Sequence, residues 1–446
     1  MEYYILLEYQ EKELKDSVKK SLQGYLEKLK KESLQNVFTF TSKGIKAKNY
    51  VGILKYKNYQ FEILPKLIDN NKIAKEDDKE RKIILKNLLY MLSLTKKLDV
   101  KESEIAKISK SKNPFLEILI KIYATSLFEC LKRFIPKNYV TEEDNLTVLK
   151  GKLLFSKHII KNSVNQAKFY CQYDEFSENN LLNQLFYYVS RLLYFVSNDN
   201  ENKRTLKFIT DCFCDIDFKK TNIYKIRNLK LTKNQTAFQK PFDLAKMFLE
   251  NSLIDMNQHK IKTISLLWDM NKLFEEFIFE FIRKNKDKIN ENFKKNNQIE
   301  VIKYQECKKL LYCKEIKRYC KNSFVDIFVN LENEEVVIID TKYKLNHDDI
   351  GKLDNQDIFQ MVTYETIHNS QNAILIYPTI KDKTINQTKE KIYKYKLCNS
   401  NKDTKQVNSK KEYYITTAAV YLGNDLQTNK IDLIYRLSNI LNKTIN

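Results

Sequence analysis

The sequence predicts an α/β protein of several domains, with a β-rich N-terminal region, a mostly helical middle region and a C-terminal α/β domain built on a central mixed sheet. The first observation behind this prediction is the length of 446 residues, which exceeds what one compact core usually holds. The second is the order of strand-like and helix-like segments, which changes near residue 84 and again near residue 256. These changes divide the chain into predicted domains at residues 1–83, 84–255 and 256–446.

The N-terminal region is predicted to hold short strands and one inserted helix. The helix is expected over Leu14–Lys31, and strands are expected at Asn36–Phe40 and within Tyr50–Leu64. Pro65 ends the last strand, because proline cannot donate to a central ladder. The polar stretch at residues 69–83 is predicted to be a connector.

The middle region carries apolar residues at helical spacing, which predicts helices over residues 85–95, 114–135 and 179–197. Pro114 stands where the first turn of a helix tolerates proline. The third of these segments contains an aromatic stripe that either packs in the core, the favoured interpretation, or stacks on nucleobases; its members are Phe186, Tyr187, Tyr188 and Tyr194.

The C-terminal region begins with an amphipathic segment at residues 266–285, which predicts a helix with one apolar face. The order that follows is typical of an α/β domain with one central sheet. Strands are expected at 299–305, 324–330, 335–344, 373–378, 391–397 and 412–422, and helices near 353–369 and 425–442.

The balance of charge favours a polyanionic partner. Lys and Arg number 78 against 57 Asp and Glu, a formal net charge of +21. Such an excess of positive charge strengthens binding to the phosphates of a nucleic acid. The alternative is compositional drift, since the chain is rich in Lys, Asn, Ile and Tyr, as an AT-rich genome would encode. No apolar run approaches the length of a membrane-spanning helix and the N-terminus does not resemble a signal peptide, so no membrane association and a cytoplasmic location are expected.

Cofactor motifs are few. The eight Cys form no CxxC pair, and Cys307, Cys313 and Cys320 are loosely spaced along a basic segment. Reduced thiols are the default interpretation and an iron–sulfur cluster is the alternative. None of the four His is paired at helical spacing, which argues against a zinc hydrolase. No glycine-rich phosphate loop is found, so no nucleotide site is expected in this chain and any nucleotide-driven motor must lie on another chain.

Asp326, Asp340 and Lys342 have the spacing of a metal-dependent phosphodiesterase site. Four aliphatic residues precede Asp340 and predict a buried strand, in which Asp340 and Lys342 project to one face. Asp326 lies on the strand before it and can point to the same side. Two converging carboxylates bind Mg²⁺, and the lysine can position or deprotonate an attacking water or offset charge on the phosphate.

The alternative is that this Asp-Thr-Lys run merely ends an ordinary strand, because D-x-K alone is a weak motif. Flanking residues favour the site. Glu275, beside Glu276 on the preceding helix, is placed where a carboxylate commonly completes such a site. Gln360 and Tyr364 stand one helical turn apart on the following helix and could support the site or touch DNA, and Lys344 adds charge nearby.

Segments along nearly the whole chain resemble one family in the right order. They are YVGILKYKNYQFEILPKL (50–67), GKLLFSKHI (151–159), CQYDEFSENNLLNQLF (171–186), DMNKLFEEFI (269–278), DTKYK (340–344) and QMVTYE (360–365). They resemble the McrC component of modification-dependent restriction systems, whose nuclease domain has the PD-(D/E)XK fold. The proline that often precedes the first Asp of that motif is Val325 here, which weakens the motif without removing a ligand.

The resemblance implies that Asp326, Asp340 and Lys342 are catalytic, that both Asp residues hold Mg²⁺, and that Glu275 is a further catalytic candidate. Gln360 and Tyr364 become supporting or DNA-contacting positions. It also implies a partner, a McrB-like AAA+ GTPase hexamer that recognises modified double-stranded DNA and translocates. The N-terminal region would engage that ring and stimulate GTP hydrolysis, while the C-terminal domain would cut.

Several functions remain open on the sequence alone. Besides an endonuclease subunit of an McrBC-like complex, the chain could be the nuclease of another motor-driven restriction or repair complex. It could also be a non-cleaving adaptor that activates the motor, or a basic DNA-binding protein without catalysis. The recognised base modification, the cleavage position, the stoichiometry and the DNA-contacting Lys and Arg residues do not follow from the sequence.

Overall fold

The computed structural model describes residues 2–27, 36–67, 78–108, 114–164, 167–218, 223–255, 260–294, 297–344, 353–379, 392–397 and 412–445. The chain forms two compact units, each assembled from separated segments. Unit 1 consists of Met1–Tyr3, Ile53–Gln60 and Asn113–Leu266, and unit 2 of Tyr4–Gly52, Phe61–Lys112 and Leu267–Asn446. The three contiguous domains predicted from the sequence stay a prediction.

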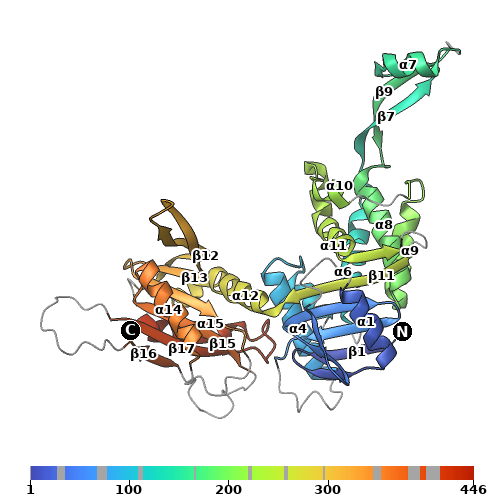
Figure 1. The fold of residues 1–446 in the computed structure, drawn as a ribbon. Coiled ribbons are helices and arrows are strands. Elements are labelled where there is room, and N and C mark those ends of the chain that lie inside the picture. The colour runs from blue at the N-terminus through green and yellow to red at the C-terminus, as the bar shows by residue number, and fades with distance from the viewer. Residues whose placement is uncertain are drawn as a thin grey trace, which may run out of the picture. The chain divides into compact units, whose positions relative to one another are not determined.

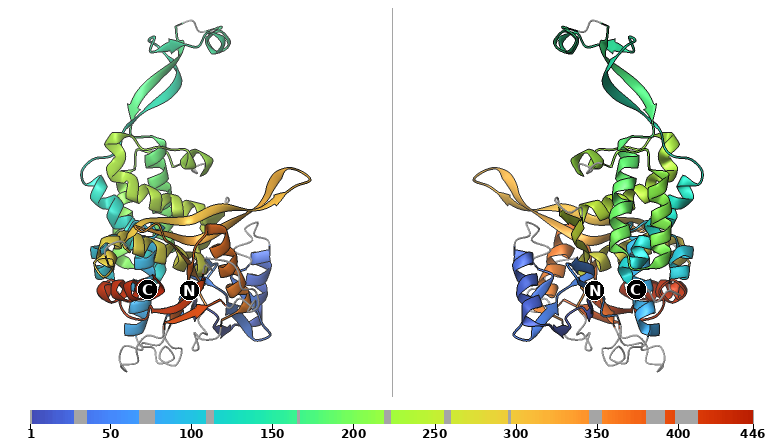
Figure 2. Two further views of the ribbon diagram at one scale, coloured as in Figure 1. Left: turned by 90° about the vertical axis from the view of Figure 1, so that its left-hand side faces the viewer. Right: turned by 90° about the vertical axis from the view of Figure 1, so that its right-hand side faces the viewer.

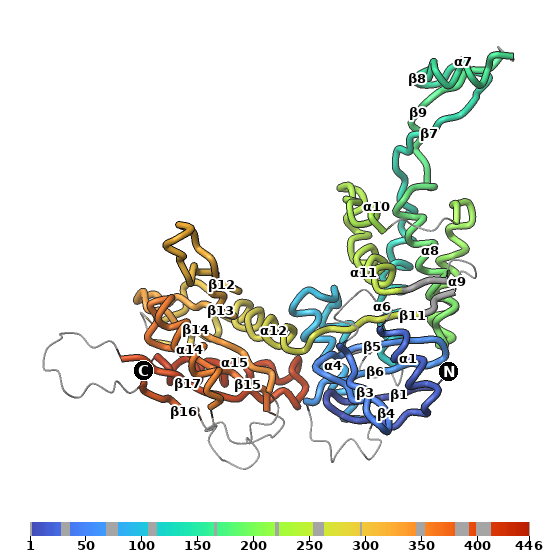
Figure 3. The backbone as a smooth tube through the Cα atoms, viewed as in Figure 1, coloured from blue at the N-terminus to red at the C-terminus, as the bar shows by residue number. Residues whose placement is uncertain are grey.

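The N-terminal segment is rich in strands, as predicted. A three-stranded antiparallel sheet has the order β2-β4-β3, and a five-stranded sheet has the order β1-β6-β5-β11-β10. Figure 3 labels β1, β3, β4, β5, β6 and β11 among these strands. Helix α1 (Asp16–Glu27) lies within the predicted helical segment, whose last four residues are outside the described ranges. The strands are β1 (Glu2–Leu7), β2 (Glu11–Glu13), β3 (Phe38–Phe40), β4 (Gly44–Ala47), β5 (Tyr50–Tyr56), β6 (Tyr59–Leu64), β10 (Ser252–Asp255) and β11 (Lys260–Asp269).

The predicted connector at 69–83 is partly wrong. Residues 68–77 lie outside the described ranges, but helix α4 (Asp78–Leu94) already begins at Asp78 and contains the rest of the connector. The charged residues at its start belong to the first turns of a helix whose later turns are buried, and the short helix α5 (Glu102–Ile108) follows it. Tertiary burial of the later turns therefore extends the helix backward into a polar sequence.

The middle region forms a helical core in unit 1. Helix α6 (Phe115–Leu131) packs against α9 (Asn200–Cys212) and α11 (Gln239–Glu250), and α8 (Leu181–Val196) packs against the same two helices. The short elements α10 (Ile223–Arg227) and η1 (Lys233–Phe238) lie beside them. Core packing of the aromatic stripe is confirmed for Phe186 and Tyr188, which are almost fully buried.

A projecting strand pair in this region was not predicted. Strands β7 (Asn138–Leu146) and β9 (Phe169–Ser177) run antiparallel, with β8 (Lys152–Leu153) and the short helix α7 (Phe155–Lys161) at their far end. Figures 1 and 2 show this pair standing away from the helices of its unit. Only Cys171 is buried in these two strands and the other residues are half-buried or exposed, so the strands lack the regular alternation of buried and exposed residues by which a strand is recognised.

The C-terminal segment forms the predicted mixed sheet, with strand order β12-β13-β14-β15-β17-β16. β13 pairs antiparallel with β12 and β14, β15 is parallel to β14 and β17, and β16 is antiparallel to β17. Helix α14 (Asn355–His368) contacts β12 to β15, while α15 (Lys430–Ile445) contacts β15 and β17. The strands are β12 (Ile299–Cys313), β13 (Arg318–Leu331), β14 (Val336–Thr341), β15 (Asn372–Thr379), β16 (Tyr393–Lys396) and β17 (Tyr414–Tyr421).

The helix predicted at 266–285 is shorter than expected. Helix α12 (Met270–Lys284) begins at Met270, because the Asp269 side chain accepts a hydrogen bond from the Asn271 amide and caps the first turn. Leu266 and Leu267 belong to strand β11 instead and do not extend the helical face. The buried face of α12 then runs from Met270 to Ile282, and the short helix α13 (Lys286–Asn290) follows.

Within the described ranges, every helix is too short or too polar to cross a membrane.

A buried carboxylate organises the helical core of unit 1. Glu117 on α6 is 3% exposed, and its carboxylate accepts hydrogen bonds from the Ser197 hydroxyl at 2.6 Å, the Asn198 amide at 2.6 Å and the Asn202 side chain at 2.9 Å. These donors lie at the end of α8 and the start of α9, so one side chain fixes three helices. A buried charge is tolerated only with such a set of partners.

Replacing Glu117 by Ala should therefore destabilise unit 1. The variant removes the carboxylate that accepts three hydrogen bonds, and we expect the free energy of unfolding to fall by about 2–3 kcal/mol. Urea denaturation followed by circular dichroism measures the change. Glu129→Ala, on the exposed side of the same helix and ion-paired only with Lys132, is the matched control and should shift stability by no more than about 0.5 kcal/mol. Equal effects of the two variants would contradict the assigned role of the network.

Candidate functional site

Asp340 lies near the end of a strand that is buried on both faces. β14 stands between β13 and β15, and its residues from Val337 to Asp340 are almost inaccessible. Asp340 itself is 0% exposed. Burial raises the pKa of its carboxyl group, while the ion pair with the Lys342 ammonium, at 2.7 Å from Oδ2, opposes that rise. The ion pair is what makes a carboxylate tolerable at this position.

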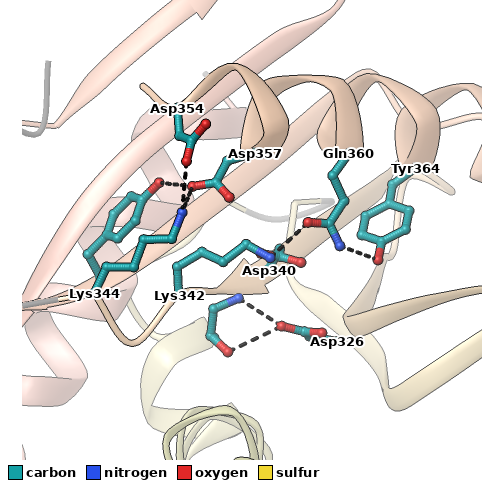
Figure 4. A network of polar contacts seen from close by, with 10 residues as sticks. Asp326, Asp340, Lys342, Lys344, Asp354, Asp357, Gln360 and Tyr364 are labelled. Carbon is teal, nitrogen blue, oxygen red and sulfur yellow. Dashed lines mark hydrogen bonds and ion pairs between the residues drawn. The ribbon is translucent and has the colours of Figure 1, made fainter. Parts of the chain in front are cut away.

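Asp326 lies directly across the strand pair from Asp340. Ile327 pairs with Ile339, so the register carried one residue further places Asp326 opposite Asp340. The Oδ2 atom of Asp326 accepts hydrogen bonds from the Thr341 amide at 2.9 Å and the Thr341 hydroxyl at 3.2 Å (Figure 4). Burial and the neighbouring charge of Asp340 raise the pKa of Asp326. Two carboxyl groups of raised pKa thus face each other.

Lys342 connects the two carboxylates to helix α14. Its ammonium pairs with Asp340 and donates to Gln360 Oε1 at 2.8 Å, and the Gln360 amide in turn donates to the Tyr364 hydroxyl at 2.6 Å (Figure 4). Burial lowers the pKa of Lys342, but the charges of Asp340 and Asp326 outweigh burial and leave that pKa above its ordinary value. A lysine held protonated in this way favours positioning and charge compensation over proton abstraction.

Glu275 approaches the same cluster from helix α12. Its carboxylate is half-buried and accepts hydrogen bonds from the Gln305 amide at 3.1 Å and from the Tyr304 hydroxyl. Burial and the charge of Asp326 raise the pKa of Glu275, so the two acids lie close enough to interact electrostatically. Glu276, its sequence neighbour, instead pairs with Lys97 on the far side. The structure thus brings Glu275 together with the five other predicted residues.

Two further residues at the site were not assigned from the sequence. Tyr304 and Gln305 lie on β12, at the edge of the sheet, and hold Glu275. Gln305 has a backbone φ of 47°, a conformation seldom adopted outside glycine. No sequence pattern marks either residue, because their role depends on how α12 packs on β12.

Lys344 was predicted to add positive charge near the site. Its ammonium pairs with Asp357 at 2.8 Å and Asp354 at 3.3 Å, at the start of α14. Asp357 also accepts a hydrogen bond from the Tyr377 hydroxyl at 3.2 Å. Lys344 therefore helps to hold α14 against the sheet (Figure 4).

Tyr343, two residues after β14, links the end of that strand to the N-terminal segment. Its hydroxyl donates to Glu8 Oε2 at 2.8 Å, and its ring packs against Phe274 of α12 with 5.7 Å between centroids. Glu8 is 1% exposed, and burial raises its pKa to about 8. Glu8 is an acid that directly follows the apolar strand β1, and this is the one sequence feature that could have indicated a buried partner for Tyr343.

The carboxylates fit a hard metal ion. Both oxygens of Asp340 are buried, and neither is matched with a hydrogen bond of good geometry, although Lys342 lies within ion-pair distance of one of them. Asp326 supplies a second oxygen donor from the facing strand. Within the described ranges, no three His, Cys, Asp or Glu side chains are arranged to hold an ion by themselves. A metal here would thus keep several water ligands, as Mg²⁺ does.

Within the described ranges, the thiols of the basic segment also form no group that could hold a metal ion. Cys307, Cys313 and Cys320 are free, and Cys307 and Cys320 are exposed. They lie along β12 and β13, beyond the carboxylate cluster.

A family comparison identifies the chain. The model of the McrBC 5-methylcytosine restriction system component family matches residues 45–378, which include all six predicted site residues and three quarters of the chain. The chain belongs to this family. Its match begins in the N-terminal sheets and ends in β15, so it covers strands and helices of both compact units. No curated protein sequence matches the chain.

Two solved structures are similar to this McrBC family member. One is a chain of the tetradecameric assembly of Thermococcus gammatolerans McrB AAA+ hexamers with bound McrC, at 20% identity and a TM-score of 0.67, with 98% of this chain and 100% of that chain covered. The other is from the Thermococcus gammatolerans McrBC complex, at 24% identity and a TM-score of 0.48, with 64% and 88% covered. The first shows that the fold is shared over almost the whole length.

The buried Glu8 predicts a pH-dependent stability. Because the folded chain raises the pKa of Glu8 from 4.5 to about 8, the folded state holds this proton more tightly than the unfolded state. The associated stability is fully present below about pH 4.5 and is lost progressively as the pH rises toward 8. Glu8→Gln keeps the acceptor for Tyr343 and removes the titration. The melting temperature of the variant should therefore rise relative to that of the wild type as the pH increases between those values.

Differential scanning fluorimetry across this pH range checks the prediction. Glu13→Gln, an exposed acid on β2, is the charge-matched control and should follow the wild type at every pH. A constant offset between Glu8→Gln and the wild type from acid to alkaline pH would show that Glu8 does not titrate as described.

Proposed function

We propose that this chain is the Mg²⁺-dependent DNA endonuclease subunit of an McrBC-type restriction complex. It would have a PD-(D/E)XK site, cut DNA when assembled with a McrB-like AAA+ GTPase hexamer, and stimulate the GTP hydrolysis of that partner. The observation that carries the proposal is the pair of the buried Asp340 and the half-buried Asp326 on adjacent strands, with Lys342 held protonated beside them. Membership in the McrBC family supports it independently.

The carboxylates of Asp326 and Asp340 are the residues that would hold the metal. A bound Mg²⁺ at this position polarises a phosphate oxygen and lowers the pKa of a coordinated water. Oδ2 of Asp340 contacts the Lys342 ammonium and Oδ1 accepts no hydrogen bond from the described residues, so the carboxylate can take a further positive partner. Metal binding would also return both raised pKa values to the acid range, because a cation favours the ionised carboxylates.

Lys342 is suited to contact the phosphate. Its ammonium is already oriented by Gln360 and by Asp340, and its charge is maintained by the two acids. When water attacks phosphorus, a new P–O bond forms, the bond to the leaving oxygen breaks, and a proton must reach that oxygen. The protonated lysine stabilises the negative charge that builds on the phosphate. Tyr364 holds Gln360, and Glu275 adds a third acid from α12 that can accept a hydrogen bond from an attacking water.

The proposed partner follows from two observations. The fold of this chain is shared with a chain from an assembly of McrB AAA+ hexamers with bound McrC. The sequence also holds no glycine-rich phosphate loop, so a nucleotide-driven motor would have to be a separate chain. The net charge of +21 suits double-stranded DNA, modified in the manner that the family description implies, as the substrate.

Removing one carboxylate should separate cleavage from assembly. Asp340→Asn keeps the shape of the side chain but removes the charge that binds metal, and we expect cleavage of methylated DNA to fall by a factor of about 1,000 or more. Binding to the AAA+ partner and stimulation of its GTPase should remain at the wild-type level. Cleavage is measured on gels with partner, GTP and Mg²⁺, and GTPase activity by phosphate release in the same reactions.

Thr366→Ala, an exposed position on α14 whose hydroxyl bonds only to its own helix, serves as the control and should cleave normally. Cleavage by Asp340→Asn at the wild-type rate would refute the site. A wild-type chain that stimulates GTP hydrolysis but never cuts would instead support the adaptor reading. Cutting driven by ATP and not GTP would point to another kind of motor.

The metal requirement gives a second test. Chelation with EDTA should stop cleavage completely, and adding Mg²⁺ back should restore it, because the two carboxylates alone cannot activate water. DNA binding by the same protein should respond to salt concentration far more than to EDTA. Undiminished cleavage in EDTA would contradict a metal-dependent site.

A further inference from the structure

The two strands at the edge of the C-terminal sheet extend beyond it as a free ribbon. β12 and β13 remain paired out to Cys313 and Arg318, whereas β14 pairs with β13 only between Ile327 and Asn330. The part from Glu306 to Lys321, here called the basic hairpin, therefore has no third strand beside it. Figures 1 and 2 show it projecting from the sheet of its own unit.

The basic hairpin is dominated by one sign of charge. It contains six basic residues and two acidic ones, and all six basic side chains are exposed. These are Lys308, Lys309, Lys314, Lys317, Arg318 and Lys321. Both acids already have partners, since Glu306 pairs with Lys303 and Glu315 accepts from the Cys313 thiol. Among the described residues, none of the six cations forms an ion pair with a carboxylate, so their charge remains available.

Charge alone does not explain the ribbon. Lysines on an exposed strand also prevent edge-to-edge aggregation, but that purpose needs no exposed aromatic residues. Here Tyr312 and Tyr319 face each other across the strands with 5.1 Å between ring centroids, and each is 52% exposed. The Lys309 ammonium lies 4.4 Å from the Tyr319 ring. This cluster stiffens an isolated ribbon, which is otherwise only marginally stable, and holds a cation on its surface.

The basic hairpin is also rooted in the candidate site. Arg318 and Asp326 belong to the same strand, eight residues apart, which corresponds to about 26 Å in an extended strand. The rise of duplex DNA is about 3.4 Å per base pair, so the tip reaches roughly eight base pairs from a phosphate bound at Asp326. A two-stranded β-ribbon is also narrow enough to enter the major groove.

We propose that the basic hairpin is a DNA-binding element that grips the phosphates of the duplex up to about eight base pairs from the scissile bond. The inference rests on the proposed endonuclease function and specifies how that site holds its substrate. Phosphates match six exposed cations without competing carboxylates, whereas a protein partner of this surface would have to supply a dense acidic patch.

Equilibrium binding tests the proposal without cleavage. The full chain is titrated against a fluorescein-labelled duplex of about 30 base pairs, with Ca²⁺ in place of Mg²⁺, at several salt concentrations. The hairpin variant combines Lys314→Gln, Lys317→Gln and Arg318→Gln at the tip. We expect its Kd to rise about tenfold or more at low salt, and the slope of log K against log salt to become shallower by about 2.7, since each lost phosphate contact removes about 0.9.

The matched control removes the same charge elsewhere in the unit. It combines Lys288→Gln, Lys294→Gln and Lys443→Gln, three exposed residues on α13, after it and on α15, and its Kd should stay within about twofold of the wild type. A hairpin variant that binds like the wild type, or a control that weakens binding equally, overturns the proposal. A wild-type chain that does not bind the duplex at low salt overturns it as well.

Native thiols provide a second readout that does not depend on substitution. Duplex should slow maleimide labelling of Cys320 on the basic hairpin and leave Cys214, an exposed thiol of unit 1, unaffected. Equal protection of both thiols, or of neither, argues against the hairpin as the contact.

The outcomes of the two proposals are separable. Asp340→Asn should bind duplex with the wild-type Kd and cut nothing, whereas the hairpin variant should recover cleavage when DNA is saturating. Tight binding through the hairpin without cleavage in the partner complex would overturn the proposed function and leave the hairpin assignment standing. Normal cleavage and unchanged DNA binding by the hairpin variant would overturn the hairpin assignment and leave the proposed function standing.

Discussion

The structure around the site depends on keeping one ionised group, Asp340, at the end of a strand that water does not reach. A carboxylate at 0% exposure is stable only if nearby positive charge or hydrogen bonds compensate for the loss of hydration. Lys342 supplies that compensation at one oxygen, Oδ2, whereas Oδ1 accepts no hydrogen bond from the described residues. The site is therefore built around a carboxylate that the described protein groups satisfy only in part.

The three residues after Thr341 anchor the end of β14 to helix α14 and to the N-terminal segment. Lys342 is held by Gln360 on α14, Tyr343 by Glu8 at the end of β1, and Lys344 by Asp357 at the start of α14. Alternate side chains thus point to α14, while the one between them points toward the N-terminal strand and α12. The chain leaving the strand cannot shift without breaking a buried contact on both sides. This explains how Lys342 can remain beside Asp340 although it lies just outside the strand itself.

Much of this arrangement could be predicted from the sequence, and the failures have physical causes. The aliphatic run before Asp340 predicted a doubly buried strand, and the spacing from Asp326 predicted the facing strand, because register and alternation are local properties. The start of α12 was misplaced because Leu266 and Leu267 continue the apolar spacing of the helix although Asp269 caps it. Glu8 and Tyr343, 335 residues apart in the chain, could not be paired, since nothing local encodes such a contact. The exposed strands β7 and β9 were missed because they bury too little for a pattern to develop.

Under the proposed function, strand β13 would link DNA binding to cleavage, because it carries both Asp326 and residues 318–321 of the basic hairpin. Its base is fixed by pairing on both sides, with β12 and with β14, whereas its outer part pairs with β12 alone. The register at the base, where Ile327 pairs with Ile339, therefore determines the position of Asp326. The pairing with β12 continues to Arg318 and so fixes the position of Arg318 relative to Asp326. A duplex held at the tip would lie at a distance from the carboxylates that the strand itself defines. Bulges in β12 near Lys309 and Leu311 bend the ribbon between its base and its tip, so under this proposal they would set the direction in which the tip points.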